Sequence, residues 1–218
     1  MAAPLIKICG VMTPTILETV IACGADMVGF VHFAKSPRHL SFDAIAPLVA
    51  QAAGRIETVV LLVDPTDADI EAAGATGVDW LQLHGRETTD RIGEIAAVSG
   101  RRLIKALPVG DADDIAVVAS YGAVADRLIL DAKPPKDATR PGGLGAVFDW
   151  SLLEALDPGL PFMLSGGLNV DNVSQAVRTV HPFGLDVSSG VERSKGIKDP
   201  DLIATFIARA RQAAQNED

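Results

Sequence analysis

The sequence has few cysteines and no metal-binding motif, and both shortages exclude classes of protein. Its 218 residues include only two cysteines, Cys9 and Cys23, which do not form a CxxC pair. A disulfide framework and a cysteine-bound zinc site are therefore not indicated. The four histidines form neither an HxH nor an HExxH motif, so we expect no catalytic metal.

Long apolar runs and basic runs are also missing. The longest apolar runs, such as residues 58–63, have the length of a strand, so we expect no transmembrane helix and no membrane partner. The first residues lack the basic start and the apolar core of a signal peptide, which favours a cytoplasmic location. A net charge of −9 without a Lys/Arg-rich run argues against a nucleic-acid partner.

What the sequence does contain is a regular alternation of strand-like and helix-like segments. We predict strands over residues 5–9, 27–33, 56–63, 78–84, 102–107, 127–131, 162–164 and 184–188. We predict helices over residues 15–23, 41–53, 67–74, 88–98, 111–120, a short one from 149, 169–180 and 199–210. Eight strand and helix units, with hydrophobic residues at 48%, predict an α/β protein with a single-domain (β/α)₈ barrel over residues 1–218. An open doubly wound sheet is the alternative, although its Gly-rich nucleotide turn is missing after the first strand.

One segment of the sequence shows no periodicity. Residues 132–146 (AKPPKDATRPGGLGA) are rich in proline, glycine and charge. A loop of this length is costly to order unless function requires it. We therefore predict a mobile loop over residues 132–146 that covers an active site.

Two similar turns follow the last two predicted strands. The apolar run 162–164 leads into the turn 165–167, and the run 185–187 leads into the turn 188–190. Glycine lets a backbone approach a ligand closely, and the first amides of a following helix are unpaired donors. Either turn alone is explained as a tight turn, but the pair on neighbouring strands predicts a phosphate site. The residues predicted to bind the phosphate are Gly166, Gly167, Ser189 and Gly190.

Polar residues at the carboxyl ends of the strands are the candidates for chemistry in such a barrel. They are Cys9, His32, Asp64, His84, Asp131, Ser165, Asp186 and Ser189, with Arg38 on the second loop. A thiol at Cys9 serves as a general base if a cation such as Lys7, one layer deeper on the same strand face, lowers its pKa. Exclusion of water around Asp131 would favour its protonated form, as a general acid requires. The simpler interpretations are that Cys9 is packed in the core and that Asp131 caps a helix or pairs with Lys133 or Lys136.

Two further side chains have both a binding and a structural interpretation. Arg38 follows a proline that stiffens its loop, and it is either a bidentate partner for a carboxylate or a solvated surface charge. His84 either contacts a ligand or pairs with Asp79 or a backbone carbonyl group. Asp186, at the end of the eighth predicted strand, is expected to contact substrate.

Several separated motifs occur in order along nearly the whole chain. They are KICG at 7–10, GF at 29–30 with SPR at 36–38, LQLHG at 81–85, LD at 130–131, GG at 142–143 with FDW at 148–150, SGGL at 165–168, and DVSSGVE at 186–192 with Gly196 and KD at 198–199. In this combination they resemble the phosphoribosylanthranilate isomerase family of tryptophan biosynthesis, whose members are (β/α)₈ enzymes. The chain departs from the family pattern at residues 11–14 and 144–146.

The resemblance implies an Amadori rearrangement that converts N-(5-phosphoribosyl)anthranilate into 1-(2-carboxyphenylamino)-1-deoxyribulose 5-phosphate. It implies Asp131 as the general acid at the ring oxygen and Cys9 as the general base at C2. It also implies that Arg38 holds the anthranilate carboxylate, that His84 and Asp186 contact the substrate, and that the two glycine turns hold the phosphate. No cofactor is implied, and the expected assembly is a monomer or a homodimer.

Two other functions fit the same barrel and phosphate turns. The first is another isomerase or epimerase of sugar phosphates, although epimerases of this architecture generally carry metal ligands on the strand ends. A related isomerase acting on a histidine-pathway substrate would be expected to have an aspartate in place of Cys9. The second is a protein that binds a phosphorylated ligand without turnover.

Overall fold

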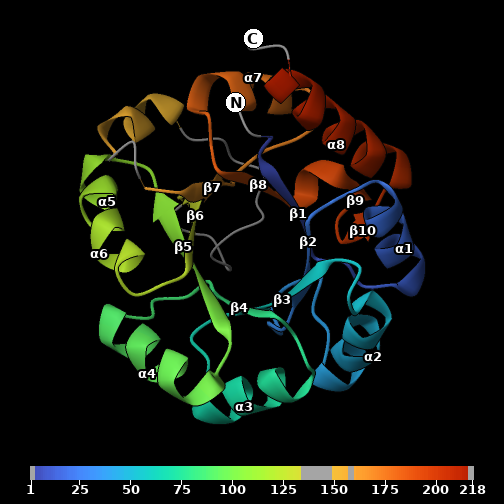
Figure 1. The fold of residues 1–218 in the computed structure, drawn as a ribbon, viewed down its shortest axis with the longest axis vertical. Coiled ribbons are helices and arrows are strands. Elements are labelled where there is room, and N and C mark those ends of the chain that lie inside the picture. The colour runs from blue at the N-terminus through green and yellow to red at the C-terminus, as the bar shows by residue number, and fades with distance from the viewer. Residues whose placement is uncertain (1–2, 134–148, 157–159, 216–218) are drawn as a thin grey trace.

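The computed structural model describes residues 3–133, 149–156 and 160–215. Within these residues, the strands β1 to β8 form one closed parallel barrel in chain order, with β1 paired to β8 (Figure 1). The helices form a ring around the barrel (Figure 1). The predicted (β/α)₈ barrel is therefore confirmed, and the open-sheet alternative is wrong.

The strands of the barrel are β1 (Leu5–Cys9), β2 (Met27–Val31), β3 (Glu57–Leu62), β4 (Trp80–Leu83), β5 (Arg102–Val109), β6 (Arg127–Ala132), β7 (Phe162–Leu164) and β8 (Gly184–Val187). The helices are α1 (Pro14–Ala22), α2 (Phe42–Ala52), α3 (Asp67–Ala75), α4 (Thr89–Ser99), α5 (Ala112–Ala116), α6 (Val118–Gly122), α7 (Val173–Val180) and α8 (Pro200–Gln215). Two short 3₁₀ helices, η1 (Trp150–Ala155) and η2 (Ser189–Val191), and a hairpin of β9 (Glu192–Ser194) and β10 (Ile197–Lys198) complete the description.

Local chemistry explains where the helices begin. Thr13 caps α1 by accepting the amide of Ile16, and proline occupies the first turn, as the sequence predicts. Helix α3 is capped by Thr66 and not by Asp67, because Thr66 and Asp69 form a reciprocal capping box.

Several predicted elements differ from the structure: the strand predicted over 27–33 ends at Val31, the short helix from 149 is the 3₁₀ helix η1, and the last helix runs to Gln215. The predicted helix 111–120 is two short helices that meet at Val117. Helix α7 begins only at Val173, because the side chain of Asn169 accepts the amide of Asp171 and holds the preceding residues in a turn. Strand β5 continues through Pro108 to Val109, whose carbonyl accepts the amide of Lys133 at 2.9 Å.

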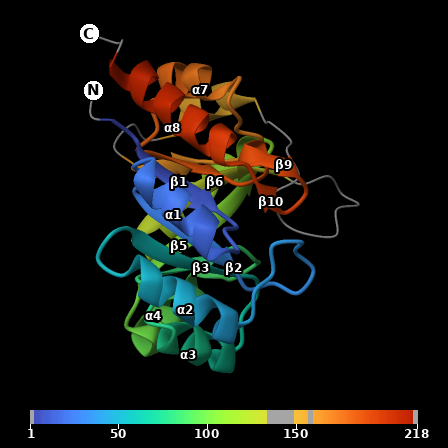
Figure 2. The same ribbon diagram turned by 90° about the vertical axis from the view of Figure 1, so that its right-hand side faces the viewer.

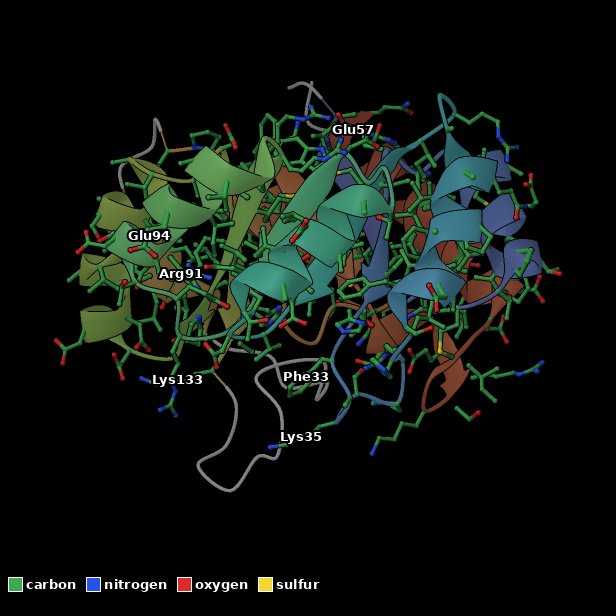
Figure 3. All side chains as sticks on the ribbon, turned by 90° about the horizontal axis from the view of Figure 1, so that it is seen from below. Phe33, Lys35, Glu57, Arg91, Glu94 and Lys133 are labelled. Atoms are coloured by element: carbon green, nitrogen blue, oxygen red, sulfur yellow. The ribbon has the colours of Figure 1, made fainter. Side chains whose placement is uncertain are left out.

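The two ends of the barrel differ in chemistry. At the amino end, the Cζ atoms of Arg102 and Arg127 lie over the ring of Trp80, at 4.1 and 4.3 Å from its centroid. The ring N–H of Trp80 donates to Glu57 at 3.1 Å. Figure 3 shows Glu57 at one end of the molecule and Phe33, Lys35 and Lys133 at the other. Met27, Val59, Trp80, Ile104, Ala106, Ile129 and Met163 form a separate cluster of buried hydrophobic side chains. Lys7 is level with Met27 of this cluster in the strand register, and Cys9 lies one layer nearer the carboxyl end, where barrels of this kind carry their chemistry.

The loop between β2 and α2 and the hairpin β9–β10 lie on the same side of the barrel (Figure 2). They are in direct contact, because a Cβ atom on Gly196 would lie 3.0 Å from the carbonyl oxygen of Pro37. The hairpin was not predicted from the sequence.

The predicted cover loop 132–146 falls, apart from its first two residues, outside the described part of the chain. None of the helices in the described residues has the length and apolar character needed to cross a bilayer.

Candidate active site

Strand alternation places the predicted catalytic residues inside the mouth of the barrel. Ile6 and Ile8 belong to the core that faces the helices, so Lys7 and Cys9 face the interior. Leu130 packs in the same outer core, and the next residue, Asp131, therefore faces inward. Because all eight strands are parallel, Cys9 at the end of β1 and Asp131 near the end of β6 lie at the same end of the barrel.

A buried ion pair lies beneath Cys9. The Nζ atom of Lys7 donates to Oδ1 of Asp186 at 2.8 Å, and neither side chain is more than 7% exposed. The strand register pairs Lys7 with Asp186 across the β1–β8 junction. Gly29 leaves room for this arrangement, since a Cβ atom there would lie 2.9 Å from Sγ of Cys9 and 3.2 Å from Cε of Lys7.

The pKa of Cys9 is raised and not lowered as the sequence suggested. Burial raises the pKa of the thiol, and the positive charge of Lys7 opposes this effect without outweighing it. Asp186 also raises the pKa of Cys9, because a nearby anion disfavours the thiolate. The pKa of Lys7 is raised as well, because the attraction to Asp186 and Cys9 exceeds the cost of burial. The charge of Lys7 therefore offsets part of the cost that burial imposes on a thiolate at Cys9.

Asp131 contacts His84, which directly follows β4 and in turn contacts Gln82 on that strand. Oδ2 of Asp131 lies 3.3 Å from Nε2 of His84, and Nδ1 of His84 lies 3.1 Å from Nε2 of Gln82. The predicted pairing of His84 with Asp79 is wrong. Asp79 accepts from the backbone amide and the hydroxyl of Thr58, and not from His84.

Lys133 does not neutralise Asp131 either. Its Nζ donates to Asp111 at 3.1 Å and to Asp114 at 2.8 Å, outside the barrel mouth. The other predicted partner, Lys136, lies outside the described residues. His84 is therefore the partner that the described part of the chain supplies to Asp131.

Arg38 is buried and forms a bidentate ion pair with Glu192. Its Nε donates to Oε1 at 2.6 Å and its Nη2 donates to Oε2 at 2.8 Å, and only 4% of the residue is exposed. The interpretation of Arg38 as a solvated surface charge is therefore wrong. Burial alone would raise the pKa of Glu192, but the hydrogen bonds from Arg38 and the charge of Lys198 lower it to about 2.

Lys198 connects this ion pair to the strand ends. Its Nζ donates to Oε1 of Glu192 at 2.9 Å and to the carbonyl of Ser188 at 2.8 Å. The hydroxyl of Ser188 donates in turn to the carbonyl oxygen of Cys9 at 3.0 Å. Burial lowers the pKa of Lys198 to about 8, although the charge of Glu192 opposes this shift.

The two predicted phosphate turns lie side by side. Strands β7 and β8 are parallel neighbours, and a Cβ atom on Gly190 would overlap the carbonyl oxygen of Leu168, just after the first turn. Gly166 and Gly167 have φ values of 86° and 65°, in the left-handed region that favours glycine. The backbone amides of Gly166, Gly167, Ser189 and Gly190 donate to no acceptor among the described residues. The second turn leads into the 3₁₀ helix η2 and not into an α-helix.

Sequence reasoning missed Gln82, Glu192 and Lys198 as parts of this site. Glu192 and Lys198 belong to the motifs that resemble the family. However, Arg38 and Glu192 are 154 positions apart, and no spacing in the sequence predicts that they pair. The described residues contain no group of three or more His, Cys, Asp or Glu side chains that could hold a metal ion.

Comparison with known proteins identifies the family. The model of the family described as "N-(5'phosphoribosyl)anthranilate (PRA) isomerase" matches residues 6–209. The chain belongs to this family. An N-(5'-phosphoribosyl)anthranilate isomerase of Azorhizobium caulinodans is 54% identical over 211 residues, which are 96% of this chain and 92% of that protein.

Solved phosphoribosylanthranilate isomerases share the fold over nearly the whole chain. The enzyme of Thermotoga maritima is 33% identical, with a TM-score of 0.85 over 96% of this chain and 99% of that one. A phosphoribosylanthranilate isomerase in complex with reduced 1-(o-carboxyphenylamino)-1-deoxyribulose 5-phosphate is 31% identical, with a TM-score of 0.81 and the same two coverages. Monomers generated from the dimeric Thermotoga maritima enzyme also give 31% identity, a TM-score of 0.81 and the same coverages. Both monomers and a dimer therefore occur among the solved relatives.

Proposed function

We propose that this chain isomerises N-(5-phosphoribosyl)anthranilate to 1-(2-carboxyphenylamino)-1-deoxyribulose 5-phosphate, with Cys9 as general base and Asp131 as general acid. The observation that carries the assignment is the placement of an inward-facing thiol and an inward-facing carboxyl group at one barrel mouth. Beside them lie two adjacent turns whose amides are free for an anion among the described residues.

The reaction needs one acid, one base and no redox partner. Asp131 gives its proton to the ring oxygen, the C1–O bond breaks, and the substrate nitrogen forms a C1=N bond. The thiolate of Cys9 takes the proton from C2, and those electrons form a C1=C2 bond while the nitrogen regains its lone pair. The enolamine then gains a proton at C1 and loses the hydroxyl proton at C2 to give the ketone. The substrate supplies its own imine nitrogen, so no catalytic lysine is required.

The remaining contacts follow from charge and position. The amides of Gly166, Gly167, Ser189 and Gly190 suit the phosphate, because unpaired backbone N–H groups bind anions. Arg38 suits the carboxylate on the aromatic ring. His84 and Asp186 would contact the sugar between these two anchors. The cover loop over 132–146 remains part of the proposal.

A fluorescence assay tests the proposal directly. Purified protein is mixed with freshly prepared N-(5-phosphoribosyl)anthranilate, and loss of the anthranilate-type fluorescence is followed. We expect an enzyme-dependent loss that requires no added metal or cofactor. Tight binding without turnover would instead support a protein that only binds the ligand.

The proposal extends to assembly and location. The described site residues all come from one chain, so a monomer would suffice, and a homodimer would leave the chemistry unchanged. Light scattering at assay concentration distinguishes the two. A cytoplasmic location stays a prediction that cell fractionation tests.

A further inference from the structure

We infer that Glu192 is a positioning residue for Arg38, and that the hairpin β9–β10 aims the free edge of the guanidinium at the substrate carboxylate. The inference rests on the proposed function and assigns it a residue that the sequence did not single out. Glu192 would not touch the substrate. It would act only through Arg38.

The geometry of the ion pair leaves one edge of Arg38 unused by Glu192. A guanidinium has five N–H donors in a planar fork. Glu192 takes the edge formed by Nε and Nη2, at 2.6 and 2.8 Å. One donor on Nη1 and the second donor on Nη2 form another edge, which can bind a second carboxylate at two points. A planar group held at one edge cannot rotate, so the direction of the other edge is set before substrate arrives.

The aliphatic part of the Arg38 side chain is also packed, against the backbone of Gly10. Gly10 has a φ of 78°, and a Cβ atom there would overlap Cδ of Arg38. The arginine side chain therefore crosses the backbone directly after Cys9. This contact brings the proposed carboxylate anchor close to the proposed base, as one substrate bridging both would need.

Glu192 is itself held by more than Arg38. Lys198 donates to Oε1 at 2.9 Å, and the amide of Gly196 donates to Oε2 at 2.9 Å. Both donors come from the hairpin that Glu192 begins. With four donors on two oxygens, the carboxylate has little freedom to follow a moving arginine.

The charges of the cluster also suit an incoming anion. Arg38 and Lys198 supply two positive charges, and Glu192 supplies one negative charge. All three side chains are at most 5% exposed, so the remaining positive charge is poorly screened by water. A substrate carboxylate would bring the buried cluster to neutrality. An isolated Arg38–Glu192 pair would offer no such surplus.

Steady-state kinetics of Glu192→Gln separates positioning from catalysis. The amide keeps one acceptor but turns a donor toward the guanidinium, so the two-point pair is lost. We expect KM for N-(5-phosphoribosyl)anthranilate to rise about 10- to 100-fold, because a loss of this size corresponds to one charge-assisted contact. The kcat should stay within about threefold of wild type. The control Glu18→Gln removes half of an exposed pair with Arg55 and should change neither parameter.

A double-mutant cycle with Arg38→Ala decides whether Glu192 acts through Arg38. In the Arg38→Ala protein, Glu192→Gln should change kcat/KM by less than about twofold, because the effects of two mutations are not additive when one residue acts through the other. Additive losses would overturn the inference, and so would a fall in kcat with unchanged KM. Wild-type turnover together with an unchanged KM in Glu192→Gln would overturn the inference and leave the proposed function intact. Absence of wild-type turnover would instead remove the proposed function.

A binding readout keeps the test independent of turnover and of folding. The probe is the reduced 1-(o-carboxyphenylamino)-1-deoxyribulose 5-phosphate bound by a solved relative, titrated by fluorescence. Its Kd should rise in Glu192→Gln by the same factor as KM. If that variant does not melt cooperatively, Glu192→Asp keeps the charge and shortens the reach by one methylene. We then expect a smaller rise in Kd, and an unchanged Kd in a folded Glu192→Asp protein would overturn the inference.

Discussion

Nε2 of His84 lies 3.3 Å from Oδ2 of Asp131, and this contact gives the proposed acid a defined orientation. The fully buried Gln82 supports the ring from the other side, since its Nε2 lies 3.1 Å from Nδ1 of His84. The ring of His84 is therefore held between Gln82 and Asp131. The buried Oε1 of Gln82 has no partner among the described residues, so the chain tolerates a local cost to hold this arrangement.

His84→Phe should separate this orienting effect from folding. The aromatic ring fills the space but offers no polar atom to Asp131, so we expect kcat to fall about 10- to 100-fold because the carboxyl group loses the contact that orients it. The melting temperature should stay within a few degrees of wild type. An unchanged kcat would mean that Asp131 needs no partner at His84.

Cys9→Ser and Asp131→Asn should each abolish most turnover. A serine hydroxyl is a far weaker base than a thiolate, and an amide cannot give up the required proton, so we expect kcat to fall about 10²- to 10⁴-fold. Binding of the reduced product analogue should remain within a few-fold of wild type, because neither variant alters the phosphate turns. Full activity in either variant would remove the acid and base assignment.

The ion pair under Cys9 predicts pKa changes of opposite sign. Burial holds the pKa of Cys9 above the usual thiol value, Lys7 lowers it, and Asp186 raises it. In a Cys23→Ser background, Lys7→Met should therefore move thiolate formation to higher pH, and Asp186→Asn should move it to lower pH. The ultraviolet absorbance of the thiolate, followed against pH, measures both shifts. Shifts of the same sign would show that the pair acts on Cys9 by packing and not by charge.

Lys198 predicts a pH dependence of substrate binding. Its pKa is lowered to about 8, so the side chain is a cation below that pH and becomes neutral above it. Loss of this charge leaves Arg38 and Glu192 as a neutral pair, and KM should rise above pH about 8 by no more than about tenfold per pH unit, since one proton is involved. Lys198→Met should show a raised KM that is constant over the same range. A wild-type KM that stays flat from pH 7 to about 9.5 would contradict this role.

Gly190→Ala should damage the phosphate site specifically. The new methyl group would overlap the carbonyl oxygen of Leu168, so the two turns must move apart. Because correct placement of a binding group within about 1 Å is worth up to 100-fold, we expect KM to rise about 10- to 100-fold. The matched control is Gly93→Ala in α4, where a Cβ atom meets nothing within 4 Å. There the helix should be stabilised by about 0.5 to 1 kcal/mol, with unchanged kinetics.

The barrel could be predicted from the sequence because its signals are local. The β-branched run at 56–63 and the cap at Ser41 each specify a nearby element, and the structure confirms strand β3 and helix α2 there. The register of the strands then brings Lys7, Cys9 and Asp186 together without further information. The prediction erred where side chains compete with the backbone, as at Asn169, whose side chain delays helix α7.

The parts of the site that escaped prediction depend on distant partners. Arg38 could be described as a carboxylate binder, but its partner Glu192 lies on a hairpin without any sequence period. The pKa of Cys9 could not be judged either, because the cation at Lys7 was evident and the degree of burial was not. No sequence pattern indicates the buried ion pair in which Nζ of Lys105, on β5, lies 2.6 Å from Oε2 of Glu87.

The junction between β1 and β8 has a consequence for biosynthesis on the ribosome. Strand β1 can pair with β8 only after β8 has been synthesised, and Glu192 is synthesised 154 residues after its partner Arg38. At about 5 to 20 residues per second, the nascent chain spends about 8 to 30 seconds with an arginine that has no counter-ion and a sheet with two open edges. A chain that ends before residue 192 would lack the partner that orients Arg38.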